Sequence, residues 1–478
     1  MNSKLKLISA ISFFLILLFL PILFGLRYDY LGKSVNITYR NMFHYFIKGE
    51  PPPYFLNETP KPLIAFLFYI LPSFAGYFLI SLLIAFSFYY FLKISEIFTN
   101  SYLTGILAFF YSFLTFEDSW QNLLSVYWVW VYIPLMIIAI YYFLKKNYLK
   151  YGILNFLAGL IRPDSWFLAF LFLLVSLRKK TKRKPLLLLP FLAPLFWLFF
   201  DQRAFANPFY SYIVTARYPL ITGILLVKPE KYFSTIFRDI TDQTGWLFLF
   251  LSILSLLITI FKNKKNFEKY LILLIVILAP FIFYFLLSFR GGVLPMRRFY
   301  LLSLVFLSFF LFQIFEQFLK SKIFLTGTKL LLFFLLFLSN FSIDKLNEIK
   351  QNLKDEEEKM AAISSSLPIL KRYLNEIKPQ YLIVPFRRKS IFEYYLPEVK
   401  KNLESFREII ALNKDLKDFK NSLLVYLIGD FAGVENYFDF LSYFRSHLLK
   451  KENLVFEPLF SSSWIRIYLL KEAGNANY

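Results

Sequence analysis

Acidic and basic side chains of this chain gather in short segments between long apolar stretches. The acids of these segments are Asp29, Glu58, Glu117, Asp118 and Asp164. The cations that recur near them are Arg40, Lys61, Arg162, Arg290, Arg297 and Arg298. A carboxylate can take a proton from a hydroxyl group, and cations can stabilise a departing phosphate, whose oxygens a guanidinium binds bidentately. These residue types together suit a displacement in which a phosphate leaves.

The composition identifies the environment in which such a site must be built. Of 478 residues, 58% are hydrophobic and only 18% are charged, below the roughly 25% that is usual in soluble domains. A water-soluble globular domain and a disordered chain are both excluded. The chain has no Cys and two His, so we expect no metal centre built from these residues. No cofactor is firmly implied, and a divalent cation stays an open possibility.

The apolar stretches predict a polytopic α-helical membrane protein, because about 20 apolar residues per helix span a bilayer. Pro72 and Gly76 are expected to divide the second stretch into a short interfacial piece and a true span. The fifth and sixth stretches are short. We place eleven spans, near 7–26, 63–92, 101–116, 123–144, 150–161, 165–177, 185–200, 245–261, 270–289, 299–319 and 323–341.

The distribution of Lys and Arg predicts the orientation in the cytoplasmic (inner) membrane. Basic residues are concentrated at the start of the chain and in every second connection, which indicates that these segments are cytoplasmic. They are Lys4 and Lys6, Lys93, Lys145 to Lys150, Arg178 to Lys184, Lys262 to Lys269, and Lys320 to Lys329. The other set is then extracytoplasmic: 27–61, 115–122, 161–165, 201–244 and 290–298. The net charge of +22 follows from this topology, so no nucleic-acid partner is expected.

The chain divides into a membrane domain over 1–344 and a smaller domain over 345–478, because charged and mixed sequence begins near residue 345. Helices are expected over 344–360 and 364–377. Strands are expected over Tyr381–Pro385, Ser422–Ile428 and Trp464–Leu470. With eleven spans and a cytoplasmic N-terminus, this small α/β domain is extracytoplasmic.

The 27–61 connection contains an amphipathic pattern. Its apolar stripe is Val35, Tyr39, Met42 and Phe46, spaced as one face of a helix that lies in the membrane interface. Gly49 and the prolines at 51–53 are expected to end this helix.

The candidate residues also have simpler readings. Asp29 could be a solvated helix cap, and Arg162 and Asp164 could pair with each other or start a helix at Pro163. The Arg cluster could contact lipid headgroups without specificity. Glu117 and Asp118 could be acids without a function, since acidic residues are tolerated on the extracytoplasmic side.

An enzyme on the extracytoplasmic side lacks ATP and nucleotide sugars, so an activated group must arrive on a lipid. A sugar on a lipid phosphate fits the cations and acids above. One carboxylate would act as base on the acceptor hydroxyl, and the sugar carbon would be displaced through an oxocarbenium-like state. A single displacement would invert the anomeric carbon.

These loops resemble the GT-C class of membrane glycosyltransferases, in particular the branch of protein mannosyltransferases and aminoarabinose transferases. Five features carry the resemblance: Asp29 after the first span, Gly49 after the outer helix, Lys61-Pro62, Arg162-Pro163-Asp164, and Arg297-Arg298-Phe299-Tyr300. The resemblance implies that Asp29 is the base, that Asp118 is the second acid, and that Lys61 contacts the lipid phosphate. It also implies a polyprenyl-phosphate sugar as donor; the acceptor, a glycan, lipid or protein, stays open, and membrane lipids surround the protein.

The chain departs from the family near the outer helix. Relatives often carry an acid within a few residues of its start, whereas Lys33 to Asn36 precede Ile37-Thr38-Tyr39-Arg40 here, and Asp29 is the acid nearby. The base could therefore be Asp118 or Glu58.

Three other functions compete with this one. A polysaccharide polymerase or O-antigen ligase could use Arg203, Arg217 and Arg238 of the 201–244 connection. A lipid flippase or transporter would need ionisable groups within the spans, and the predicted spans hold almost none. A membrane scaffold could keep the fold and lack the base.

Overall fold

A computed structural model describes most of the chain. The described residues are 3–27, 31–52, 59–99, 101–115, 122–177, 184–215, 226–262, 267–289, 292, 297–318, 321–340, 343–385, 388–405, 409, 416–427 and 454–472.

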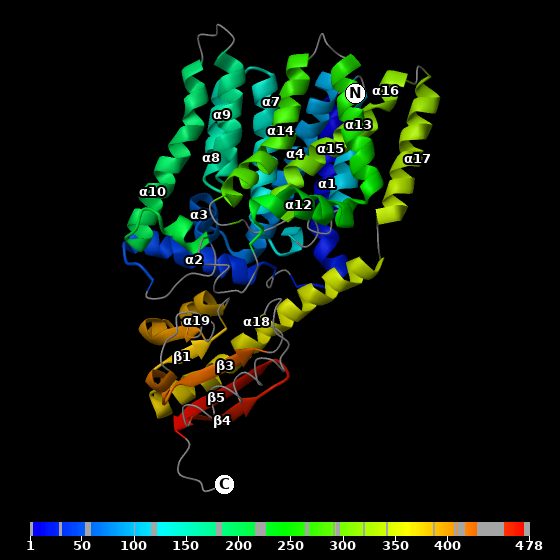
Figure 1. Cartoon of the computed structure of the whole chain (residues 1–478). Helices are drawn as coiled ribbons and strands as arrows, with labels where there is room; N and C mark the ends of the chain where they lie inside the picture. Colours follow the sequence, from blue (N-terminus) through cyan, green and yellow to red (C-terminus); the bar gives the residue numbers. More distant parts are fainter. Residues whose placement is uncertain are drawn as a thin grey trace.

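A bundle of apolar helices makes up most of the molecule (Figure 1). Along the chain it consists of α1 (Ser3–Phe24), α4 (Ser73–Phe98), α5 (Tyr102–Thr115), α7 (Val129–Leu144), α8 (Tyr148–Gly159), α9 (Asp164–Leu177), η1 (Lys184–Phe191), α10 (Leu192–Phe205), α13 (Trp246–Lys262), α14 (Phe267–Ser288), α15 (Leu301–Gln313), the short α16 (Phe315–Phe318) and α17 (Lys322–Asn340). Each predicted span thus falls on a helix.

Length distinguishes these helices. Among the described residues, five helices are long and apolar enough to cross a membrane: those over 4–24, 74–98, 185–205, 267–288 and 323–340. α13 makes a sixth when joined to α12 (Pro229–Thr244), although the two meet at a bend of 110°. α5, α7, α9 and α15 are apolar but shorter. The chain is therefore a polytopic membrane protein with several apolar spans.

The second predicted span is divided at Pro72, as the sequence indicated, whereas Gly76 lies inside α4. α3 (Pro62–Ile70) ends before Leu71, and α4 begins at Ser73 after Pro72. Proline lacks the N–H that an interior helical position donates, so the break falls at Pro72.

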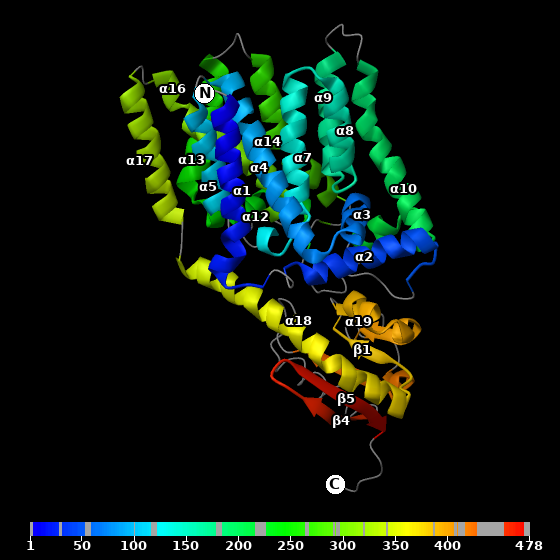
Figure 2. The same ribbon diagram turned by 180° about the vertical axis from the view of Figure 1, so that it is seen from behind.

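The two ends of the bundle differ. The N-terminus and α16 lie at one end, and α2 (Lys33–Lys48), α12 and the C-terminal sheet lie at the other, which we call the domain face (Figures 1 and 2). The Lys6 ammonium donates to Glu96, so the start of α1 and the end of α4 lie together at the end of the bundle opposite the domain face. The predicted alternation of the connections is consistent with this arrangement.

One predicted cytoplasmic residue is instead inside a span. Lys329 was assigned to a basic connection, but it lies within α17 and is 0% exposed. Its ammonium pairs with the carboxylate of Glu316 and donates to the Thr104 hydroxyl at 2.6 Å. The expectation that the spans hold almost no charge is wrong here, because the carboxylate and hydroxyl replace the water that a buried ammonium would otherwise need.

We expect Glu316→Gln to lower the free energy of unfolding by about 3 kcal/mol, because it leaves a buried ammonium without its carboxylate. Adding Lys329→Met to that variant removes the uncompensated charge and should recover most of the loss. Unfolding of the detergent-solubilised protein, followed by Trp fluorescence, measures both effects. Equal stability of Glu316→Gln and the wild type would contradict a stabilising pair.

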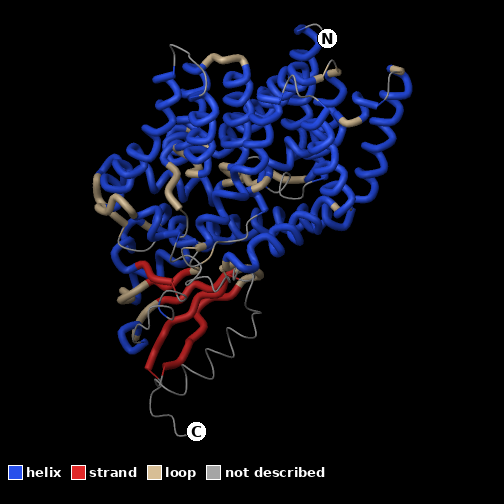
Figure 3. The backbone as a smooth tube through the Cα atoms, turned by 45° about the horizontal axis from the view of Figure 1, so that its top comes forward, coloured by secondary structure: helices blue, strands red, loops and turns tan. Residues whose placement is uncertain are grey.

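The C-terminal domain is built on a five-stranded mixed sheet of order β2-β1-β3-β5-β4, gathered on one side of the helical part (Figure 3). Its strands are β1 (Leu382–Val384), β2 (Leu403–Ser405), β3 (Leu423–Leu427), β4 (Leu454–Ser461) and β5 (Ile465–Glu472). β1 pairs in parallel with β2 and β3, and β5 pairs antiparallel with β3 and β4. The three predicted strands correspond to β1, β3 and β5.

A single helix connects the bundle to this sheet. The sequence predicts two helices over 344–360 and 364–377, but the structure has one, α18 (Ile343–Ile377). The serines at 364–366 do not break it because their hydroxyls donate to backbone carbonyls of the preceding turn at 3.0, 3.0 and 2.9 Å. α18 runs from the bundle to the sheet, below the ends of α1 and α2 (Figure 2).

α2 is the predicted amphipathic helix. It ends at Lys48, and Gly49 adopts a left-handed φ of 68° and donates its N–H to the Tyr45 carbonyl at 2.7 Å, which is a frequent helix end. Tyr39 and Met42 of the apolar stripe are buried. The stripe therefore packs on the bundle.

The opposite face of α2 is covered by the C-terminal domain. The Asn41 amide donates to the Ser390 carbonyl at 2.9 Å, and the Tyr45 hydroxyl donates to Glu393. Both acceptors belong to α19 (Lys389–Tyr395), and Lys400 lies 4.5 Å from the Tyr45 ring. α2 is thus held between the bundle and the C-terminal domain, which its amphipathic pattern does not indicate.

Candidate functional site

A cavity of about 330 Å³ opens at the domain face. Five segments distant in sequence line it: 26–27 after α1, 31–35 at the start of α2, residues between 122 and 127, Arg298, and residues 352–357 of α18. The size lies at the lower end of the range for small-molecule sites, roughly 300–1,000 Å³. Membrane domain and C-terminal domain therefore form the cavity together.

Charge is divided between the walls of this cavity. The membrane domain contributes the cations Arg27, Lys33 and Arg298, and α18 contributes the acids Glu356 and Glu357. The remaining polar lining residues include Ser34, Asn122 and Ser125. An anionic group is therefore favoured at the membrane-domain wall, and hydrogen-bond donors are favoured at the α18 wall.

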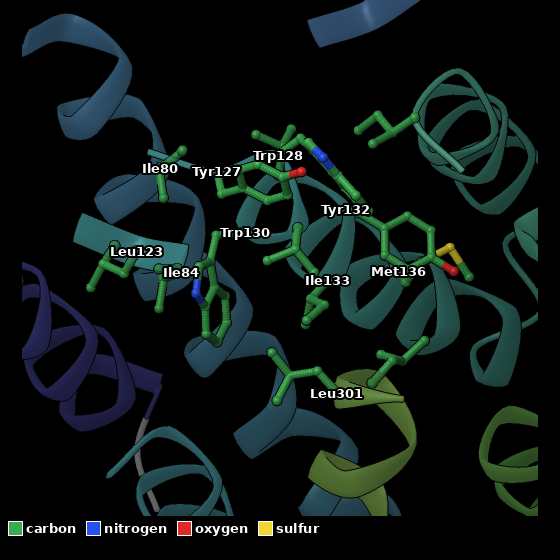
Figure 4. Close-up of a cluster of buried hydrophobic side chains, with 14 of the residues drawn as sticks. Ile80, Ile84, Leu123, Tyr127, Trp128, Trp130, Tyr132, Ile133, Met136 and Leu301 are labelled. Carbon is green, nitrogen blue, oxygen red and sulfur yellow. The ribbon is translucent and has the colours of Figure 1, made fainter. Parts of the chain in front are cut away.

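Three predicted cations meet at the indole of Trp128, which immediately precedes α7. Lys61 Nζ lies 4.7 Å from the centre of the Trp128 ring system, Arg162 lies 5.7 Å away, and Arg298 lies 5.8 Å away. Arg298 also stacks at 4.6 Å on Tyr127, which lines the cavity. Figure 4 shows Tyr127 and Trp128 among the buried side chains around the start of α7. Attraction between cations and ring faces holds these groups together despite their like charge.

Lys61 enters this cluster from the residue before α3. It is 6% exposed, and its ammonium donates to the Thr59 carbonyl at 3.0 Å. Pro62 at the first position of α3 fixes the chain direction after it. The predicted Tyr39 belongs to the same group, because Lys61 Nζ lies 5.7 Å from its ring centre.

Arg162 is tied into the protein more tightly than the other cations. Its Nε donates to Asp164 Oδ1 at 2.9 Å, and one terminal nitrogen donates to Asp164 Oδ2 at 2.8 Å. It also donates to the Tyr284 hydroxyl and to the carbonyls of Arg298 and Phe299. At 2% exposure, Arg162 joins α9 to the segment before α15. The simpler reading, that Arg162 and Asp164 pair, is confirmed, and these contacts favour a positioning role over phosphate binding.

A strained turn sets the position of the Trp128 region. Val126 has a φ of 53°, which is rare for a β-branched residue. Gly32 at the start of α2 approaches it so closely that an added Cβ would lie 2.4 Å from the Val126 Cβ. Since Ser125 and Tyr127 on either side line the cavity, the Gly32–Val126 contact fixes one of its walls.

Other predicted residues are placed elsewhere or lie outside the described residues. Arg40 of α2 stacks on Tyr69 at 6.0 Å and on Tyr394 at 5.9 Å, so it belongs to the contact with α19. The candidates outside the described residues are Asp29, Glu58, Glu117, Asp118 and Arg290, and of Arg297 only the backbone, in η3 (Arg297–Phe299), is described.

Sequence reasoning missed Tyr127, Trp128, Glu356 and Glu357. The run Tyr127-Trp128-Val129-Trp130 was a signal, because large aromatic side chains with a polar edge favour a membrane boundary. The two acids carry no such signal, since they are part of an acid run on a charged helix.

Comparison with known proteins agrees with this architecture. No family model matches the sequence, and no curated protein matches it. The structure is similar to the crystal structure of ArnT from Cupriavidus metallidurans bound to undecaprenyl phosphate, with a TM-score of 0.50 over 97% of each chain. The chain has the ArnT fold. Sequence identity with ArnT is 9%, so the similarity establishes the fold, and the resemblance to GT-C lipid-phosphate glycosyltransferases is confirmed at that level.

Proposed function

We propose that this protein is an integral-membrane glycosyltransferase that moves a sugar from a polyprenyl phosphate to an acceptor hydroxyl on the extracytoplasmic side. Lys61 and Arg298 on one Trp128 ring, beside a cavity at the domain face, carry the proposal. Two cations held side by side there suit a phosphate that gains charge as it leaves. The ArnT fold supports the donor class, because that structure is bound to undecaprenyl phosphate.

The base in this proposal is Asp29, with Asp118 as the second candidate. Residues 26–27 and 31–35 line the cavity and flank Asp29 in the sequence, and the lining residue Asn122 follows Asp118 by four positions. A carboxylate that takes the acceptor's proton makes the hydroxyl oxygen a better nucleophile. That oxygen then attacks the anomeric carbon, the bond to the phosphate oxygen breaks, and the configuration inverts.

The rival polymerase or ligase assignment receives less support. Arg203 of the 201–244 connection donates to the Ile47 carbonyl at the end of α2, and Arg238 is exposed on α12. Neither residue lines the cavity. The described arginines on its wall are Arg27 and Arg298.

We expect Lys61→Ala to weaken binding of undecaprenyl phosphate about tenfold or more, since a hydrogen bond to a charged group contributes about 1.5–3 kcal/mol. Titration of the purified protein with this lipid, followed by quenching of Trp fluorescence or by native mass spectrometry, measures the change. Lys231→Ala on the exposed part of α12 is the matched control. Unchanged affinity in Lys61→Ala would remove its phosphate role.

The proposal also requires the domain face to be extracytoplasmic. Protease added to intact spheroplasts should then cut the chain beyond residue 345 and leave the membrane domain. Inside-out vesicles of the same cells should protect that region. The reverse pattern in the two preparations would contradict the orientation.

A further inference from the structure

The α18 wall of the cavity is fixed to the membrane domain at two points. Arg388, which is 5% exposed and follows β1, donates to Glu356 Oε1 at 2.5 Å and to Oε2 at 2.6 Å. The same guanidinium donates to the Ser34 hydroxyl at 3.3 Å. The Glu357 carboxylate accepts a hydrogen bond from the backbone N–H of Arg27 at 3.3 Å. Both carboxylates are therefore held against the segments that precede and start α2.

Arg388 orients Glu356 but leaves part of the hydrogen-bonding capacity of this carboxylate unused. A carboxylate has about four lone-pair positions, and a bidentate guanidinium occupies two of them. Glu356 lines the cavity, and its side chain is 41% exposed. It can therefore accept further hydrogen bonds from a molecule in the cavity, with no cost of ordering the side chain.

The membrane-domain wall is the one that suits the leaving phosphate, because Arg298 lines it and Lys61 lies over the same Trp128 ring. The second substrate must then approach along α18, where Asn352 adds an amide beside the two carboxylates. Carboxylates accept from hydroxyl groups and repel phosphate.

We propose that Glu356, Glu357 and Asn352 of α18 form the acceptor subsite, and that it selects an uncharged, hydroxyl-rich glycan headgroup over a phosphorylated one. This inference rests on the proposed function and specifies its acceptor. Arg388 is the positioning residue of the subsite. The C-terminal domain thus completes the substrate site through α18.

The test uses the purified full-length protein in nanodiscs with undecaprenyl phosphate added. Saturation-transfer NMR with the methyl glycosides of glucose, galactose and mannose should detect binding of at least one, and glucose 6-phosphate should give no signal. Glu357→Gln and Asn352→Ala should each weaken binding of that glycoside about tenfold. Glu348→Gln, an exposed acid of α18 away from the cavity, is the matched control and should have no effect.

Glu356→Gln tests the central residue, and thermal unfolding of the same sample separates lost binding from lost folding. Arg388→Lys keeps the charge but not the bidentate geometry, so it should weaken glycoside binding and leave undecaprenyl phosphate binding unchanged. Absence of glycoside binding, stronger binding of glucose 6-phosphate, or full glycoside binding by Glu357→Gln and Asn352→Ala would each overturn the subsite. If the wild type does not bind undecaprenyl phosphate, the proposed function itself fails.

Discussion

Asp29→Asn should reduce sugar transfer from a polyprenyl-phosphate sugar at least about a hundredfold, because an amide cannot take the acceptor's proton and general-base catalysis contributes typically 10²–10⁴-fold. The substitution is nearly isosteric, so folding and membrane insertion should be preserved. Transfer of radiolabelled sugar by the purified protein measures the rate, and binding of undecaprenyl phosphate should remain close to that of the wild type.

Two further variants define what this result means. Asp344→Asn, at an exposed position in the first turn of α18, controls for the loss of one acid near the domain face. Full activity in Asp29→Asn would move the base elsewhere, and Asp118→Asn is then the next variant. Full activity in both would contradict a base supplied by either residue.

The parts of the fold that sequence predicted are those set by local chemistry. The end of α2 follows from Gly49 and the prolines behind it, and the α3–α4 break follows from Pro72, because each acts on its own backbone. The buried strands β1 and β3 follow from short apolar runs between turns. The length of α18 did not follow, since the serines at 364–366 read as a break until their hydroxyls are seen to bond to the helix itself.

The sequence predicted which residue types form the candidate site better than it predicted which residues they contact. Lys61 and Arg298 stand out as cations at a membrane boundary, yet their common contact, Trp128, reads as part of an apolar span. Glu356 reads as a solvated acid, because only the docking of α18 brings it to the cavity. Lys329 reads as a loop residue, because its pairing with Glu316 depends on how α17 packs against α16. Such contacts join distant segments, and no local pattern encodes them.

The second large effect concerns Arg162, for which the two readings give opposite results. As a structural residue it holds Asp164, the Tyr284 hydroxyl and two carbonyls before α15. Arg162→Met should then lower the free energy of unfolding by about 3–5 kcal/mol, because it leaves the buried Asp164 without its partner. Equilibrium unfolding in mixed detergent micelles, followed by Trp fluorescence, measures this loss.

A double-mutant cycle separates pairing from ligand binding. Arg162→Met combined with Asp164→Asn removes both charges, so the double variant should be more stable than Arg162→Met alone. Since Arg162 fixes the carbonyls of Arg298 and Phe299, the double variant should also bind undecaprenyl phosphate more weakly, through displacement of Arg298. If Arg162→Met unfolds like the wild type and loses only lipid binding, Arg162 is a phosphate ligand, and the pair with Asp164 contributes little to the fold.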